Sequence, residues 1–393
     1  MAIKHTDHAV QHKSTVPANE NDLVSLFVRE YDGTPPGTPI EKRRAVLMLH
    51  GRTVPALAIY DIGTGDYSWS RVLAHAGYDV FVMDLQGMGL SPRPKMDEPC
   101  NANPAHHSRV TDPNLPLTEP CSPYYKFQLN NSQSDWDEVH RVVEYIRTEV
   151  HPGVGKLDLI GNSAAAFALG PYTIQHKENV RSLMLQAPVF RADGQASAPG
   201  TEFGAPSTMP VNTPPYPMNL GTKAGLKAAL EAEAGTDCPG QHGDDLDALV
   251  DMVWDAIMAS DTKGRTWGKV LPDGRTEGVS RQRQAFWWGW NKKTVPLHGV
   301  LGGDVPVCIV YGDLDRTVTT AGLSVTELYK AVPGDRKLMF KVSCASHQWP
   351  WEGRRTTLHT MSKQWLKHGK VFGRDKGSFH VDGNDDVTPL PVP

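Results

Sequence analysis

Short apolar runs separated by polar stretches recur along the first part of the chain. Residues 23–31 alternate between apolar and polar positions, which indicates a strand with one buried face. Residues 45–49 and 79–84 are nearly continuous apolar runs, typical of parallel strands that are buried on both faces. A helical pattern over residues 68–76 lies between these two runs. Because a strand, a helix and a second strand follow one another, we expect a βαβ unit.

The same alternation continues farther along the chain. Apolar residues recur at helical spacing over residues 132–150, and Ser134 with Asp137 has the spacing of a capping box near the start of this helix. The later predicted elements are strands at 157–160, 182–186, 305–311 and 338–342, and helices directly after Ser163, at 323–332 and at 355–368. Strands that alternate with helices predict an α/β fold with a doubly wound, mostly parallel sheet.

Two segments interrupt this alternation. Residues 95–130 are rich in Pro and Asn and show no periodicity, which indicates an irregular excursion from the fold. Residues 191–304 carry helical patterns at 223–234, 244–260 and 280–291. Because these patterns replace the expected sheet strands, we interpret residues 191–304 as a helical cap inserted between two strands of the core.

The predicted elements divide the chain into a core and three additions. The length of 393 residues fits a single α/β fold with insertions. The predicted parts are a polar N-terminal arm (1–22), an α/β core (23–190 and 305–369), the helical cap (191–304) and a polar C-terminal tail (370–393).

Composition narrows the class of partner. The chain is 39% hydrophobic and 21% charged, with a formal net charge of −4, as in an ordinary globular protein. It has no basic excess to hold nucleic acid and no polybasic run for a membrane surface. No segment reaches the ~20 consecutive apolar residues of a membrane span. We therefore expect a small-molecule substrate, no nucleic-acid partner and no membrane partner, and leave homo-oligomer formation open.

Cysteine usage leaves the compartment open. The first 22 residues are polar and contain no apolar core of a signal peptide, so the chain as given is expected to be cytoplasmic. However, Cys100 and Cys121 bracket the irregular excursion and can close it as a disulfide loop. If these two cysteines pair, a secreted or periplasmic location with a removed leader follows. If they stay reduced, the cytoplasmic expectation holds.

Gly-x-Ser tripeptides single out a candidate nucleophile only when their context is considered. They occur at Ser91, Ser163, Ser280 and Ser324. At an average usage of ~7% each for Gly and Ser, about two would occur by chance in a chain of this length. Only Ser163 directly follows a predicted buried strand and directly precedes a predicted helix, where a sharp turn projects the side chain at the sheet edge. The alternative is that Ser163 only caps the following helix.

A serine nucleophile needs an imidazole that takes its proton and a carboxylate that orients the imidazole. His347 follows the last predicted strand of the core, in a loop at the same sheet edge. Asp313 and Asp315 both follow the strand predicted at 305–311, and either can instead be an ordinary turn residue. The order Ser163, Asp315, His347 is nucleophile, acid, base.

Together these stretches resemble the α/β-hydrolase superfamily, and more loosely its cap-bearing, esterase-like members. The resemblance rests on residues 45–51, 84–91 and 312–318 and on the surroundings of Ser163 and His347. It covers residues 23–190 and 305–369. One departure is Ala165, where family members usually have the second glycine of Gly-x-Ser-x-Gly.

The resemblance implies a role for each candidate residue. Ser163 would be the nucleophile, His347 the base and Asp315 the acid, with Asp313 as the alternative acid. The backbone amides of Arg52 and Ala164 would then form the oxyanion hole. The sharp strand-to-helix turn that carries the nucleophile is called the nucleophile elbow. Because this chain has a serine there, it does not resemble haloalkane dehalogenases or epoxide hydrolases, which have an aspartate at that position.

Aromatic residues gather in the predicted cap and after His347. Trp287, Trp288 and Trp290 lie in one short stretch of the cap, and Trp349 follows His347. Four aromatics within residues 286–290 cannot all face one side of a helix, so at least one is expected to face the cleft beneath the cap. The competing interpretation is that they pack the cap onto the core. An apolar or aromatic substrate is expected.

These residues predict a serine hydrolase that cleaves a carboxylic ester or lactone through an acyl-enzyme, with no cofactor and no metal. The Gly-Asn-Ser elbow also resembles hydrolases that cleave a carbon–carbon bond in a diketone-like ring-cleavage product. Amide hydrolysis and acyl transfer to an acceptor other than water are further alternatives. The alternative outside enzymes is a ligand-binding receptor of the same fold.

Overall fold

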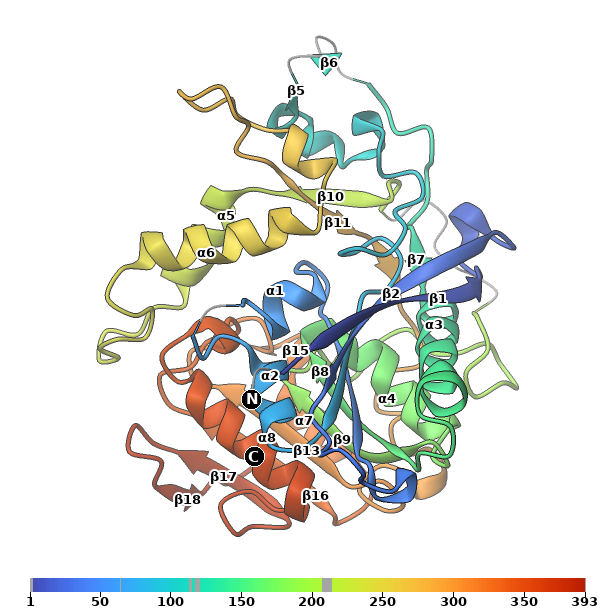
Figure 1. The fold of residues 1–393 in the computed structure, drawn as a ribbon, viewed down its shortest axis with the longest axis vertical. Helices are drawn as coiled ribbons and strands as arrows, with labels where there is room; N and C mark the ends of the chain where they lie inside the picture. Colours follow the sequence, from blue (N-terminus) through green and yellow to red (C-terminus); the bar gives the residue numbers. More distant parts are fainter. Residues whose placement is uncertain (1–2, 64, 113–114, 117–120, 207–213, 393) are drawn as a thin grey trace.

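One large mixed sheet forms the centre of the protein (Figure 1). The computed structural model describes residues 3–63, 65–112, 115–116, 121–206 and 214–392. Over these residues the sheet has ten strands in the order β1-β2-β4-β3-β8-β9-β13-β16-β17-β18. The strands from β4 to β17 in this order are parallel, whereas β1, β2 and β18 join through antiparallel pairings. The predicted α/β fold with a mostly parallel sheet is confirmed.

The parallel strands from β4 to β16 in this order are almost completely buried, as their apolar sequences require. The strands of the sheet are β1 (His5–Lys13), β2 (Leu23–Asp32), β3 (Ala45–Leu49), β4 (Asp79–Met83), β8 (Leu157–Asn162), β9 (Val180–Gln186), β13 (Val307–Gly312), β16 (Lys337–Val342), β17 (Gly377–Val381) and β18 (Val387–Pro389). The short strands outside it are β5 (Thr111–Asp112), β6 (Leu115–Pro116), β7 (Asn130–Asn131), β10 (Met218–Gly221), β11 (Ser280–Arg283), β12 (Ala285–Phe286), β14 (Thr319–Thr320) and β15 (Leu323–Ser324).

Helices cover both faces of the sheet. One face packs against α3 (Ser132–Tyr145), α4 (Ala166–Gln175) and α7 (Val325–Ala331). The other face packs against α1 (Ala56–Tyr60), α2 (Trp69–His75) and α8 (Arg355–His368). Successive strand residues point to opposite faces, so Leu47 of β3 enters the first core and Val46 and Met48 enter the second. Each parallel strand therefore stabilises two apolar layers.

Several single turns of helix connect these elements. They are η1 (Pro17–Asn19), η2 (Ile40–Lys42), η3 (Pro99–Asn101), η4 (Pro104–Arg109), η5 (Ile146–Val150), η6 (Ser163–Ala165), η7 (Gly264–Thr266), η8 (Leu297–Gly299) and η9 (Trp349–Trp351). The predicted helix at 132–150 is thus α3 followed by the π turn η5. Its capping box is formed by Asn131 and Ser134, so the predicted pair of Ser134 and Asp137 is wrong. Asn131 precedes the helix, where a capping side chain has to stand.

Within the described part of residues 191–304 there are two long helices and three short strands. The helices are α5 (Lys223–Ala232) and α6 (Leu246–Ala259), and β10 pairs with β11. The helix predicted at 280–291 is wrong, because β11 and β12 occupy this stretch. Tertiary contacts override the local pattern here: Arg283 makes a buried ion pair with Asp135 at 2.6 Å. Gly289 also has a positive φ of 74°, which is incompatible with an α-helix.

The irregular excursion at 95–130 packs on the cap region. Ala102 forms a β-bridge with Met218, and both belong to a small apolar cluster that includes Trp267. Cys100 and Cys121 form a disulfide bond that closes the excursion as a loop. In Figure 1, α5, α6, β10 and β11 lie above the sheet, together with β5 and β6 of the excursion.

Both ends of the chain add strands to the sheet. The stretch expected to be a polar arm contains β1, which pairs with β2 along its whole length. The stretch expected to be a polar tail contains β17 and β18, and β17 pairs in parallel with β16. The outer strands β1, β17 and β18 keep many side chains at least partly exposed, so they lack the apolar runs that mark the central strands.

A second disulfide bond links distant parts of the chain. Cys238 and Cys344 are bonded across a sequence separation of 106 residues, and this pair was not predicted. The remaining cysteine, Cys308, is buried and free. In the described part of the chain, the helices are too short or too polar to cross a membrane.

The two disulfides differ strongly in the length of the loop that they close, which leads to a test. In the chain-entropy model, the 106-residue separation of Cys238–Cys344 corresponds to about 5 kcal/mol and the 21-residue separation of Cys100–Cys121 to about 3 kcal/mol. We expect replacement of both Cys238 and Cys344 by serine to lower the free energy of unfolding more than replacement of both Cys100 and Cys121 by serine. Denaturant unfolding measures both losses, and equal losses would contradict the loop-length explanation.

Candidate active site

Ser163 stands on a strained turn between β8 and α4. Its φ angle is 54°, a left-handed conformation that is unfavourable for a residue with a side chain. A Cβ atom at Gly161 would lie 2.9 Å from Leu169 Cδ1 and 3.0 Å from Ala165 Cβ. The glycine therefore makes room for the methyl group of Ala165, which occupies the position of the usual second glycine. The turn leaves the Ser163 side chain at the carboxyl edge of the sheet.

Ser163, His347 and Asp315 form a continuous chain of hydrogen bonds. His347 Nδ1 lies 2.8 Å from Asp315 Oδ2, and His347 Nε2 lies 2.9 Å from Ser163 Oγ. Because the carboxylate can only accept, Nδ1 carries the ring proton, and Nε2 is left to accept the proton of the serine hydroxyl. The arrangement can therefore activate Ser163 as a nucleophile.

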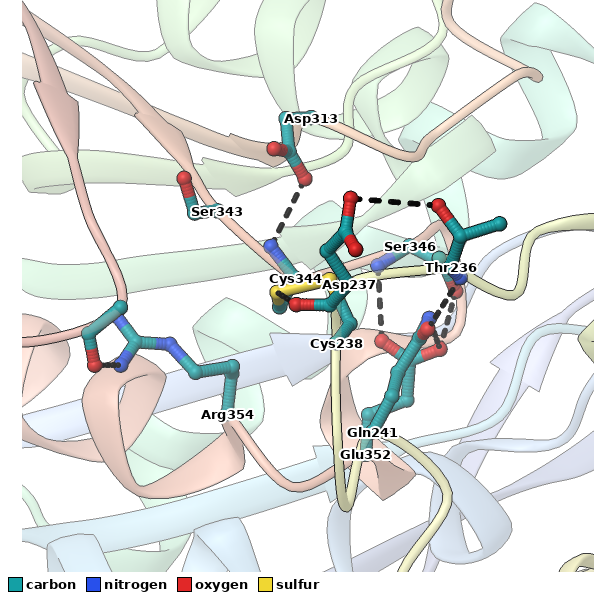
Figure 2. The surroundings of a disulfide bond; sticks show 12 residues. Thr236, Asp237, Cys238, Gln241, Asp313, Ser343, Cys344, Ser346, Glu352 and Arg354 are labelled. Carbon is teal, nitrogen blue, oxygen red and sulfur yellow. Dashed lines mark hydrogen bonds between the residues drawn. A yellow bond between two sulfur atoms is a disulfide. The ribbon is translucent and has the colours of Figure 1, made fainter.

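The structure distinguishes between the two candidate acids. Asp315 Oδ1 accepts hydrogen bonds from the amides of Thr317 and Val318 at 2.8 and 3.0 Å, which fixes its other oxygen toward His347. Asp313 points elsewhere and accepts from the Cys344 amide at 2.9 Å, as Figure 2 shows. Asp315 thus joins the turn and the imidazole, and Asp313 only stabilises the neighbouring loop.

The charges around His347 favour its protonated form. Burial lowers the pKa of His347, but the carboxylates of Asp315, Glu233 and Glu352 together outweigh it. The pKa of the imidazole is therefore above its usual value. A base with a raised pKa takes up the serine proton more readily in the transition state.

A small recess lies between Ser163 and the loop after β3. It has a volume of about 30 Å³ and is lined by Gly51, Arg52, Ser163, Asn162 and His347 among others. A Cβ atom at Gly51 would lie 3.0 Å from Ser163 Cβ, so only glycine allows this close approach. The amide of Ala164 stands in the first turn of the helix, where an N–H group has no intrahelical acceptor. The recess is suitable for the oxygen of a carbonyl group bound at Ser163.

His50 fixes the loop that carries Gly51 and Arg52. This histidine is buried, its Nε2 accepts from the Leu85 amide at 3.0 Å, and its Nδ1 donates to Gly51 O at 2.6 Å. Burial lowers the pKa of His50 to about 3, so the ring is neutral at physiological pH. His50 was not predicted as a site residue, although its position at the end of a buried strand indicates one.

A larger cavity of about 650 Å³ opens beside Ser163 and His347. Trp287, Trp288 and Trp290 are among the residues that line it. Trp349 is not among the residues that line this cavity in the described structure; its side chain is fully buried, and its indole donates to Arg354 O.

The wall of this cavity combines aromatic and cationic side chains. Phe167 stacks on Trp287 with ring centroids 4.7 Å apart and an interplanar angle of 11°. Arg52 and Arg191 also line the cavity, and Arg52 donates to Gln284 Oε1 at 2.7 Å. Phe167 was not predicted, although its place in the helix that follows Ser163 brings it to the site.

Metal-ligating groups are not assembled in the described residues: no group of three or more His, Cys, Asp or Glu side chains is placed to hold a metal ion.

Comparison with known proteins gives the same fold. Residues 44–220 match the family model described as alpha/beta hydrolase fold. A serine hydrolase structure from the polyaromatic hydrocarbon-degrading bacterium Cycloclasticus zankles is 13% identical, with a TM-score of 0.50 over 92% of this chain and 98% of that chain. No curated protein sequence matches the chain. The chain therefore has the alpha/beta-hydrolase fold.

Two further solved structures are similar at lower TM-scores. A thermophilic esterase from Thermogutta terrifontis is 12% identical, with a TM-score of 0.47 over 93% of this chain and 98% of that chain. The 2-hydroxy-6-oxo-6-phenylhexa-2,4-dienoate hydrolase from Rhodococcus sp. strain RHA1 is also 12% identical, with a TM-score of 0.45 over 92% and 99%.

The hydrogen-bond chain predicts how a fluorophosphonate probe reacts. Wild-type protein should be labelled at Ser163, and Ser163→Ala should not. We expect Asp315→Asn to slow labelling by about 10⁴-fold, because an amide favours the wrong tautomer of His347. The matched variant Asp313→Asn should keep most of the rate. Labelling rates measured by mass spectrometry test this, and a large loss confined to Asp313→Asn would reverse the assignment of the acid.

Proposed function

We propose that this chain is a serine hydrolase that cleaves carboxylic esters through an acyl-enzyme intermediate. The observation that carries the proposal is the hydrogen-bond chain from Ser163 through His347 to Asp315, which opens on a cavity of about 650 Å³. A purely ligand-binding receptor does not need an oriented imidazole beside a strained serine. Lactones belong to the same proposal, because a lactone is a cyclic ester.

The proposed reaction uses each group in turn. Ser163 Oγ attacks the carbonyl carbon while His347 Nε2 takes the hydroxyl proton. The amides of Arg52 and Ala164 donate to the oxyanion that develops on the carbonyl oxygen. His347 then returns the proton to the departing alcohol oxygen, and Ser163 carries the acyl group. A water molecule then gives a proton to His347 Nε2 and attacks the acyl carbonyl carbon. The bond to Ser163 Oγ breaks, the imidazole returns the proton to that oxygen, and the carboxylic acid leaves.

The cavity wall suggests the class of acyl group. Phe167 and Trp287 present a stacked aromatic surface, which favours an apolar or aromatic moiety. Arg52 and Arg191 add positive charge to the same cavity. They favour carbon–carbon bond hydrolysis of an anionic diketone-like product as the second candidate, together with Asn162 beside the nucleophile.

The disulfides support a proposal about the compartment. Two bonded cysteine pairs, Cys100–Cys121 and Cys238–Cys344, are typical of proteins that work in an oxidising environment. We therefore favour a secreted or periplasmic location over the cytoplasm.

A substrate panel tests the proposed reaction. We expect wild-type protein to hydrolyse p-nitrophenyl esters or members of a lactone panel, and Ser163→Ala to lose this activity. The panel should contain acyl chains of graded length, a benzoyl ester and a vinylogous diketone. If every ester and lactone is inert while the diketone is cleaved, the second candidate replaces the first.

The aromatic wall predicts a change in acyl selectivity. We expect Phe167→Leu to lower kcat/KM for the benzoyl ester relative to the butyryl ester about fivefold, since an aromatic contact contributes about 1 kcal/mol. Phe372→Leu is the matched control, because Phe372 packs on the opposite face of the sheet. Steady-state rates with both esters give the ratio. An unchanged ratio in Phe167→Leu would place the acyl group elsewhere.

A further inference from the structure

A segment of the cap region reaches the two loops that carry Asp315 and His347. Helix α5 ends at Ala232, and the next residue, Glu233, is its C-cap. The Glu233 side chain is acidic and yet buried, with only 7% of the residue exposed. A buried carboxylate is costly unless its oxygens receive hydrogen bonds, so the partners of Glu233 define its role.

Both oxygens of Glu233 accept from backbone amides of the site. Oε2 accepts from the amide of His347 at 2.8 Å, and Oε1 accepts from the amide of Arg316 at 2.8 Å. Arg316 directly follows Asp315 in the sequence. One carboxylate thus links the loop of the base to the loop of the acid, and these bonds do not involve the side chains that react.

A covalent bond holds the same cap segment against the base loop. Cys238, shortly after Glu233, is bonded to Cys344, shortly before His347. Figure 2 shows this disulfide among the polar groups of both segments. The carboxylate of Glu233 therefore reaches His347 from a segment that cannot drift away from it.

Gln241 adds a second, polar connection. Its Nε2 donates to Glu233 O at 3.1 Å and to Glu352 Oε1 at 3.0 Å. Glu352 in turn accepts from the Ser346 amide at 2.8 Å and from Ser346 Oγ at 2.6 Å. Ser346 immediately precedes His347, so the base loop is bonded to the cap segment on both sides of the imidazole.

The charge of Glu233 acts on the imidazole as well. The pKa of Glu233 lies above its usual value, because burial and the nearby Asp315 carboxylate outweigh the amides of His347 and Arg316 that donate to it. The carboxylates facing His347 are Asp315, Glu233 and Glu352, each from a different segment of the chain. Asp315 makes the direct hydrogen bond, and Glu233 contributes through space.

We propose that Glu233, supplied by the cap region, is a positioning residue that holds the loops of Asp315 and His347 in register and stabilises the protonated imidazole. This inference rests on the proposed serine hydrolase function. It means that the cap region completes the geometry of the site, in addition to covering the substrate cavity. Glu233 itself does not touch the reacting atoms.

The test measures the pH dependence of fluorophosphonate labelling at Ser163 in full-length Glu233→Gln, Glu233→Asp and wild-type protein. Labelling needs neutral His347, so its rate falls as the pH drops through the pKa of the imidazole. Glu233→Gln removes a negative charge, which lowers the pKa of His347. The acid limb, meaning the fall in labelling rate on the acidic side of the pH profile, should therefore move to lower pH. The maximal rate should fall by about 10²-fold, because the loops lose their common acceptor.

The aspartate variant separates positioning from charge. Glu233→Asp keeps the charge on a shorter side chain, so its acid limb should stay near that of the wild type while its maximal rate falls. Glu231→Gln is the matched control: this residue is exposed on the same helix, and both limb and rate should be unchanged. Thermal unfolding of each variant checks that it is folded.

The outcomes distinguish this inference from the proposed function. If wild-type protein is not labelled, the serine hydrolase proposal fails first. If wild-type protein is labelled and Glu233→Gln keeps the acid limb of the wild type, Glu233 is a structural residue only and the inference is overturned. If Glu233→Gln does not fold, Glu233→Asp decides: a maximal rate equal to that of the wild type would contradict the positioning role.

Discussion

The hydrogen bond between His347 Nε2 and Ser163 Oγ joins residues that are 184 positions apart, and the geometry of the site depends on it. It can form because β8, β13 and β16 are parallel strands of one sheet, whose carboxyl ends meet at the same edge. Burial of these strands on both faces fixes their register, since a slip of one residue would exchange the two apolar cores. The position of the imidazole at the edge of the sheet therefore depends on the packing of the two apolar cores along the strands.

The parts of the fold that the sequence predicted are those in which local pattern and burial agree. Strand β8 is buried along its whole length and Ser163 directly follows it, while His347 lies in the loop after β16, so their meeting at one edge followed from topology. Asp313 and Asp315 could not be separated in this way, because both leave the same strand. Their difference lies in side-chain direction, which is set by the amides of Thr317 and Val318.

The features that the sequence did not predict depend on contacts between distant segments. Strands β1, β17 and β18 are partly exposed, and β11 takes its conformation from pairing with β10 instead of from its own apolar spacing. Glu233 lies in an ordinary polar stretch, and nothing local distinguishes it from Glu231. The bond between Cys238 and Cys344 likewise requires the cap region to be folded over the base loop before the pairing is apparent.

That bond also makes part of the molecule a covalent ring. The ring runs from Cys238 through α6, β11 and the acid loop to Cys344, and it contains most of the cap region together with Asp315. A protease that cuts the backbone once inside this ring opens it without releasing a fragment, so both new ends stay tethered to the base loop. A single cut in the part of the cap region that lies within this ring therefore leaves the loop of His347 bonded to Cys238.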